Sequence, residues 1–275
     1  MFCRFCWCLT LLLAAIAVTP LDAQSQTSYR GMDRNDYPGD DAMKTLHQTF
    51  VFTGYWLNNP PGERQNTWQG HRETLEAMGY GFLLLFNGRE YAAIKASGNA
   101  TRLGAKDAAG AVQSAKREGF PRGAILFLDQ EQGGRMLPDQ RAYIHAWADA
   151  VARGGYRAGV YCSGIPFRES GSVTVVTADD IRDNAGRREL HFFVSNDQCP
   201  PSLGCVVGTP ARPADSGVGF ASVWQYAQSP GRPQMTAACR RTYAADGNCY
   251  APGLSGVYLD LDSADSADPS HARTR

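Results

Sequence analysis

Eight short apolar runs alternate with amphipathic segments along most of this 275-residue chain, and this alternation restricts its fold more than any other feature. Parallel strands that are buried on both faces read as continuous apolar runs, and helices usually connect them. The pattern therefore predicts a parallel sheet with helices outside it. The expected strands are 29–34, 50–57, 80–87, 124–131, 157–163, 190–196, 220–227 and 256–262.

The clearest helix covers residues 138–155, where Tyr143, Ile144, Trp147 and Val151 share one stripe before a glycine pair that stops the helix. Further helices are expected at 39–49, 67–78, 102–118 and 177–185. After the sixth strand the helical signal fades into cysteine-bearing loops.

Eight strands alternating with helices match the α/β class and a (β/α)8 TIM barrel, which takes about 250 residues. We expect the barrel to be irregular in its last third. An open doubly wound sheet is the alternative. Such sheets usually carry a glycine-rich phosphate turn after the first strand, whereas residues 31–40, GMDRNDYPGD, place acids there.

Residues 1–23 resemble a secretory signal peptide, with Arg4 near the start, an apolar run from Leu9 to Val18 and the small residue Ala23 before a polar stretch. A membrane anchor is the alternative, but the run is short for a span of about 20 residues. We therefore expect a secreted or periplasmic protein with no membrane span after signal removal. The barrel domain is expected at 24–265, followed by a disordered tail at 266–275.

The chain has 27 basic and 27 acidic residues, so its formal net charge is zero. A nucleic-acid-binding protein would be expected to have a basic patch, so the balance argues against a nucleic-acid partner. With 43% apolar residues and 29 glycines, the composition is typical of a compact globular domain, which we expect to be a monomer.

Five cysteines follow the signal segment. Cys162 lies inside an apolar strand and is expected to be a buried free thiol. In an exported protein the other four can form disulfides, and we favour Cys199–Cys205 and Cys239–Cys249 among three possible connectivities. Zinc is the alternative, but neither pair has the spacing of a structural zinc site.

The fourth apolar run, AILFLDQEQGG at 124–134, continues directly into Asp129 and Glu131. Residues i and i+2 of a strand share a face, and barrel active sites form at the carboxyl ends of the strands. Both acids should therefore point into one site. Other strand ends are also polar, and they carry Asp33, Asn87, Tyr161, Ser163, Asn196, Asp197, Asp260 and Asp262.

Carboxylates crowded at one mouth repel each other, so at least one should keep its proton to unusually high pH and can act as a general acid. This suits cleavage of a glycosidic bond, in which a carboxyl protonates the leaving oxygen. Glu131 has the longer reach and is the candidate donor. Asp129, held nearer the sheet, would orient the substrate and stabilise charge.

The seventh strand carries Trp224 and Tyr226 on one face and Gln225 on the other. It could offer a sugar either an aromatic stacking platform or a polar contact. The aromatic residues could equally pack in the core, as large aromatics often do. The same alternatives hold for Tyr55 and Trp56.

Motifs at five strand ends resemble a known group. They are GMD at 31–33, LDQE at 128–131, VYCSG at 160–164, VWQYA at 223–227 and YLDLD at 258–262. They are similar to the family 25 glycoside hydrolases, the muramidase-type lysozymes. They are still more similar to a related bacterial glycoside-hydrolase-like barrel domain, formerly a domain of unknown function. The resemblance covers roughly residues 29–265.

This resemblance implies that Glu131 is the catalytic acid and that Asp129 positions the 2-acetamido group of the substrate for neighbouring-group participation. Asp33 and Asp260 would be further acids lining the cleft, although the motif leaves open whether Asp260 or Asp262 faces inward. The implied partner is a polysaccharide or peptidoglycan substrate with N-acetylated amino sugars.

Other chemistries have less support. The five histidines form no HExxH pair, and no Gly-x-Ser-x-Gly motif occurs. We expect no cofactor and no metal. Two alternative hypotheses stay open: a barrel that binds glycan or another envelope component without turnover, and a metal-dependent hydrolase with Mg²⁺ or Ca²⁺ among the acids.

Overall fold

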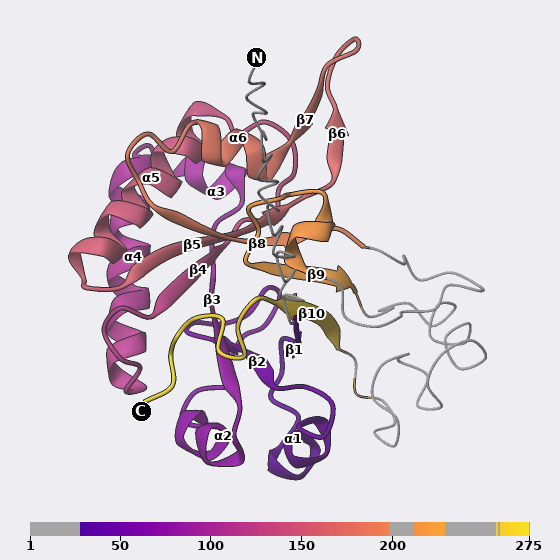
Figure 1. The fold of residues 1–275 in the computed structure, drawn as a ribbon. Helices are drawn as coiled ribbons and strands as arrows, with labels where there is room; N and C mark the ends of the chain where they lie inside the picture. The colour runs from indigo at the N-terminus through magenta and orange to yellow at the C-terminus, as the bar shows by residue number, and fades with distance from the viewer. Residues whose placement is uncertain (1–27, 198–211, 229–256, 258, 275) are drawn as a thin grey trace, which may run out of the picture.

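A computed structural model describes residues 28–197, 212–228, 257 and 259–274. Eight strands close into one barrel, shown in Figure 1, which confirms the predicted α/β barrel. In barrel order they are β1 (Tyr29–Asp33), β10 (Asp260–Ala264), β9 (Val223–Ala227), β8 (Leu190–Ser195), β5 (Arg157–Ser163), β4 (Ile125–Asp129), β3 (Gly81–Asn87) and β2 (Phe52–Trp56).

The final strand, β10, runs antiparallel to both of its neighbours, β1 and β9, while the other neighbouring strands are parallel. Two expectations for this strand were wrong: it spans 260–264 rather than 256–262, and Asp260 begins it. Because the direction is reversed, the start of β10 lies beside the end of β1, and Asp260 pairs with Asp33. The irregularity falls in the last third, as expected.

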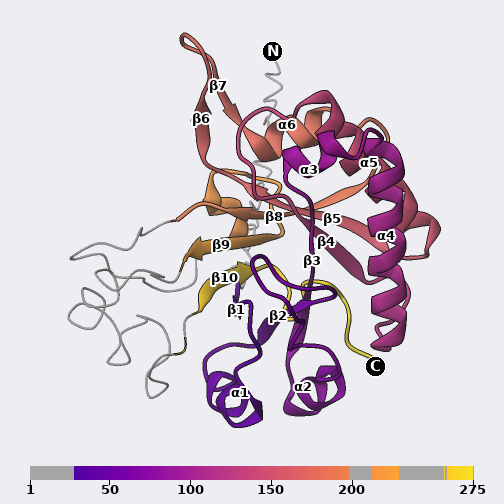
Figure 2. The same ribbon diagram turned by 180° about the vertical axis from the view of Figure 1, so that it is seen from behind.

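Helices cover the barrel unevenly. They are α1 (Asp40–Leu46), α2 (Arg72–Met78), α3 (Tyr91–Ala96), α4 (Ala100–Arg117), α5 (Pro138–Arg153) and α6 (Thr177–Asp183), with a short 3-10 helix η1 (Pro213–Ser216). Figures 1 and 2 show α4 and α5 side by side outside the barrel and α1 beside α2. None of the helices in the described ranges has the length and apolar character needed to cross a membrane.

The sequence did not predict α3, η1 or a hairpin of β6 (Pro166–Arg168) and β7 (Thr174–Val176) that projects from the barrel. Each strand of the hairpin has three residues, which is too short for an alternating pattern to stand out. The hairpin follows β5 directly, so it rises from the end of the barrel where the carboxyl ends of the parallel strands gather.

Large aromatic side chains fill the barrel interior because the neighbouring strands carry glycine beside them. A Cβ on Gly31 would lie 2.1 Å from the Phe52 ring, and one on Gly159 would lie 2.4 Å from the Phe127 ring. Each glycine is the register partner of the aromatic residue that it accommodates. The centre of the barrel is therefore filled by side chains and leaves no room for a ligand.

The C-terminal segment closes the opposite end of the barrel. Pairing between β3 and β4 begins at Leu84 and Leu126, so polar backbone groups at the starts of both strands need other partners. Ser270 supplies them: its N–H donates to the Phe82 carbonyl at 2.9 Å, its carbonyl accepts from Ile125 at 2.8 Å, and its Oγ accepts from the Leu84 N–H at 2.8 Å. Residues 266–274 thus differ from the expected disordered tail.

We predict that Ser270→Ala destabilises the chain by about 1–3 kcal/mol, because the buried Leu84 N–H loses its acceptor. Urea unfolding measures the difference. The matched control is Ser170→Ala in the exposed turn between β6 and β7, which should change stability by less than about 0.5 kcal/mol. Equal stability of the two variants would show that the hydrogen bond from the Leu84 N–H to Ser270 Oγ does not stabilise the fold.

Candidate active site

A cavity of about 180 Å³ opens at the mouth of the barrel. Polar residues of its lining lie on or just after β1, β4, β5 and β9 and at the start of β10, and they include Asp33, Asp129, Glu131, Tyr161, Gln225 and Asp260. These residues lie far apart in the sequence, and the closed sheet brings them together. No lysine or arginine is among the described residues that line this cavity.

A second cavity of about 310 Å³ adjoins the first and shares Pro61, Asp129 and Glu131 with it. Asn87 at the end of β3 lines this second cavity, beside Arg89. The Arg89 guanidinium already donates to Asp107 at 2.8 and 3.0 Å. Asp129 and Glu131 therefore lie at the junction of the two cavities.

A chain of hydrogen bonds fixes the polar groups on the β1 and β9 side of the cavity. The Tyr161 hydroxyl donates to Gln225 Oε1 at 2.8 Å, and Gln225 Nε2 donates to Asp33 Oδ2 at 2.9 Å. Gln228 Nε2 also donates to Gln225 Oε1, at 3.1 Å. Gln225 thus orients the Asp33 carboxyl group. The sequence had left open whether this strand offers a polar contact or an aromatic stacking platform, and the structure shows the polar group at the cavity.

Burial raises the pKa of Asp33 from 3.8 to about 6, against the opposing effect of its hydrogen bonds from Gln225 and Asp262. The charge of Glu131 raises this pKa further. The Asp33 side chain lies at the end of β1 with only 6% of its surface exposed. Around neutral pH this carboxyl group is therefore close to its titration range.

Asp129 is 5% exposed, and no donor among the described residues lies within hydrogen-bonding distance of either carboxyl oxygen. Burial raises its pKa well above 3.8, and the charges of Glu131 and Asp33 add to the rise. A buried carboxylate without a donor is costly, so the surroundings of Asp129 favour its protonated form. A substrate that brought a donor would favour the charged form.

Glu131 stands further out, in the loop after β4, with its side chain exposed at the rim. Desolvation by the surrounding walls still raises its pKa. Two side chains of α6 bind the backbone of this loop. The Gly134 N–H donates to Thr177 Oγ1 at 2.8 Å, and the Met136 N–H donates to Asp180 Oδ2 at 2.9 Å. The N-terminal turn of α6 therefore supports the segment that carries Glu131.

Asp262 does not line either mouth cavity. It lies one step deeper in β10, fully buried, and its pKa is raised well above 3.8 by burial and by Asp33. No donor from the other described residues reaches the carboxyl oxygens of Asp262. A hydrogen bond between Asp262 and Asp33 therefore requires a proton on one of the two carboxyl groups. The sequence had left open which of the two β10 acids faces inward. Asp260 lines the cavity, and Asp262 does not.

Trp224 and Tyr226 were expected to be substrate-binding residues, but they lie outside the two mouth cavities. Strand alternation turns Gln225 inward, so its neighbours face outward, where they contact each other edge to face at 5.9 Å. The Trp224 indole N–H donates to the Asn196 carbonyl at 2.8 Å. The aromatic pair therefore packs on the outer side of β9.

Two other aromatic residues line the cavity instead of Trp224 and Tyr226. Trp56 and Phe193 line the cavity of about 180 Å³, together with Asn35, Pro61, Leu85 and Gln228. The Trp56 indole N–H donates to the Arg34 carbonyl at 3.1 Å, and the Phe193 ring lies 4.7 Å from the Tyr161 ring. Trp56 had been left undecided, and Phe193 could have been found by counting two residues back from the polar end of β8.

The structure describes only one of the five cysteines that follow the expected signal segment. Cys162 is a buried free thiol, as expected. Cys199, Cys205, Cys239 and Cys249 lie outside the described residues. Within those residues no three or more His, Cys, Asp or Glu side chains are grouped so as to hold a metal ion.

We predict that stability falls as pH rises from about 4 to about 6, because folded Asp33 binds its proton more tightly than the unfolded chain does. A rise of about two pKa units corresponds to about 3 kcal/mol. Asp33→Asn should therefore equal the unmodified chain below pH 4 and exceed its stability at pH 8 by up to that amount. Urea unfolding across the pH range measures this.

The control for this measurement is Asp139→Asn, which makes the same change at an exposed position on α5. This control should keep the pH dependence of the unmodified chain. An Asp33→Asn variant that is no more stable at pH 8 than at pH 4, relative to the unmodified chain, would contradict the assignment.

Solved structures share this fold. An uncharacterised protein of B. stearothermophilus matches with a TM-score of 0.55 and 17% identity, over 89% of this chain and 100% of that one. The Tat-secreted protein Rv2525c of Mycobacterium tuberculosis matches with 0.52 and 14%, over 86% and 95%. The spore cortex lytic enzyme SleM of Clostridium perfringens matches with 0.51 and 13%, over 87% and 68%. At these identities the likeness concerns the fold alone.

No curated protein matches the sequence. A protein family does: the domain described as "Rv2525c-like, glycoside hydrolase-like" matches residues 50–189, which include β2 to β5 and both Asp129 and Glu131. This agrees with the resemblance read from the strand-end motifs. The chain belongs to the family of Rv2525c-like, glycoside hydrolase-like domains.

Proposed function

We propose that this protein is an exported glycoside hydrolase that cleaves peptidoglycan-type glycan containing N-acetylated amino sugars. The observation that carries the proposal is the pair Asp129 and Glu131 at the junction of two cavities, each with a pKa raised by burial. A raised pKa at a cleft is what a general acid needs.

In the proposed reaction, the Glu131 carboxyl gives its proton to the glycosidic oxygen while the bond from that oxygen to the anomeric carbon breaks. The carbonyl oxygen of the 2-acetamido group forms a bond to the same carbon, so the electron pair that leaves is replaced. Asp129 accepts a hydrogen bond from the acetamido N–H and holds the group in place. Water then attacks the anomeric carbon while the bond from that carbon to the acetamido oxygen breaks and its electron pair returns to the acetamido carbonyl. The Glu131 carboxylate takes up the proton that the water loses.

The remaining lining suits a sugar. Asp33, Asp260, Tyr161 and Gln225 present acceptors and donors for hydroxyl groups, and Asn87 lies along the adjoining cavity. Trp56 and Phe193 offer apolar surface to the C–H faces of a ring. The two adjoining cavities would hold sugar units on either side of the scissile bond.

The comparisons support this proposal by analogy. SleM is a spore cortex lytic enzyme. LytC of Streptococcus pneumoniae, which matches with a TM-score of 0.50 and 10% identity over 46% of its own length, is a modular autolysin. Rv2525c is Tat-secreted, which agrees with the export expected for this chain. Function on one barrel fold does not transfer automatically, so the site must be tested directly.

We predict that Glu131→Gln lowers release of reducing ends from purified peptidoglycan by about 10²–10⁴-fold, because the proton donor is lost. Binding of the glycan should change little, since the amide keeps the size of the side chain. Glu73→Gln, the same change at an exposed site on α2, is the control and should keep full activity. Activity of the unmodified chain should fall as pH rises through the raised pKa of Glu131.

Two outcomes would decide against acid-assisted hydrolysis by Glu131. An unmodified chain that binds glycan but releases no reducing ends at any pH would favour a glycan-binding barrel without turnover. Activity that disappears with EDTA and returns with a divalent ion would favour the metal-dependent alternative.

A further inference from the structure

A third cavity, of about 520 Å³, lies away from the mouth of the barrel. It is bounded by the C-terminal half of α5, the starts of β5 and β8, and the segment 187–189 that leads into β8. Active sites of barrels form at the other end of the strands, so this cavity is separate from the candidate active site. It shares no lining residue with either mouth cavity.

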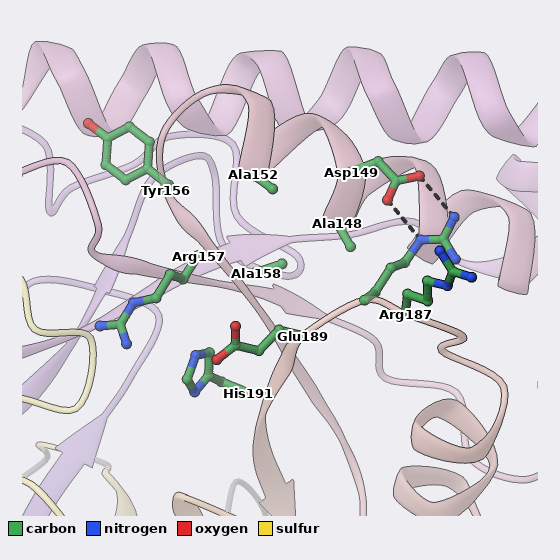
Figure 3. A pocket seen from close by; sticks show the side chains of 10 residues that line it. Ala148, Asp149, Ala152, Tyr156, Arg157, Ala158, Arg187, Glu189 and His191 are labelled. Atoms are coloured by element: carbon green, nitrogen blue, oxygen red, sulfur yellow. Dashed lines mark hydrogen bonds and ion pairs between the residues drawn. The ribbon is translucent and has the colours of Figure 1, made fainter.

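The cavity exists because the elements around it are short or carry small side chains. Helix α6 ends at Asp183 after seven residues, and it leaves the gap beside α5 uncovered. The apolar lining consists largely of alanines, namely Ala148 and Ala152 on α5 and Ala158 on β5. Figure 3 shows these methyl groups facing the space between α5 and β5.

Charged groups at the two ends of the cavity are unevenly paired. Asp149 holds Arg188 with two hydrogen bonds of 2.9 Å, and Arg157 Nε donates to the Gly123 carbonyl at 2.7 Å. Arg187 is exposed, and its guanidinium group makes no ion pair or hydrogen bond with any other described residue. In Figure 3, Arg187 lies toward the end occupied by Asp149 and Ala148.

The opposite end combines Arg157, Glu189 and His191. The His191 Nε2 atom is buried and has no hydrogen-bond partner among the described residues. Desolvation, with the nearby Arg157, lowers the pKa of His191, so the ring is neutral at pH 7. Three arginines then face two acids, which leaves one net positive charge for a ligand to neutralise.

We infer that this cavity binds a small organic acid, with its carboxylate on Arg187 and its apolar body over Ala148, Ala152 and Ala158. A single positive charge favours a monoanion, and the alanine floor favours an apolar body over an inorganic ion. An arginine without a carboxylate partner can bind a ligand carboxylate through two parallel hydrogen bonds. The site lies apart from Glu131, so it does not depend on the proposed hydrolysis.

Benzoate is a suitable probe, with benzamide as the uncharged molecule of the same shape. Calorimetric titration of the full chain should show saturable benzoate binding and at least about tenfold weaker benzamide binding. Arg187→Gln should weaken benzoate binding about tenfold, and Ala152→Leu should weaken it by at least as much because the larger side chain fills the cavity. Both positions are exposed, so both variants should fold.

Arg102→Gln, the same charge change at an exposed position on α4, is the control and should bind benzoate as the unmodified chain does. Glu131→Gln should also bind it normally. The inference is overturned by an absence of saturable benzoate binding, by equal affinity for benzamide, or by unchanged affinity in both Arg187→Gln and Ala152→Leu.

Discussion

The burial of several carboxyl groups at one end of a closed barrel, without cationic partners, is the constraint on which the rest depends. Asp33, Asp129 and Asp262 are each at most 6% exposed. None of the ion pairs among the described residues includes one of these three or Glu131. With no counter-charge, burial disfavours the ionised forms, so protons stay in the site at pH values where isolated carboxyl groups have lost them.

The reversed final strand and the packed interior turn this constraint into a site. Antiparallel pairing of β10 with β1 sets Asp260 opposite Asp33, and the inward orientation of Gln225 on β9 lets its amide donate to Asp33. Below the cavity, the rings of Phe52 and Phe127 occupy the space that Gly31 and Gly159 leave free, so the interior of the barrel is packed. At the far end, Ser270 joins β3 to β4 and completes the closure.

Much of this arrangement could be predicted from the sequence, since apolar runs locate the barrel strands and the i, i+2 rule places Asp129 with Glu131. The direction of β10 could not, because an alternating strand reads the same both ways. The order of residues 266–274 was missed because their polar composition hides backbone contacts that depend on distant strands. Alternation placed Trp224 and Tyr226 on one face of β9 and Gln225 on the other, but the sequence did not show which face points into the cavity.

The most direct test of the central claim is a carbon-detected NMR titration of the aspartate and glutamate carboxyl groups in the full chain. The account predicts that Asp33 titrates near pH 6 rather than near 3.8, and that Asp129 and Asp262 still hold their protons when the exposed carboxyl groups have lost theirs. Titration of all three aspartates together with the exposed carboxyl groups, near pH 4, would contradict it.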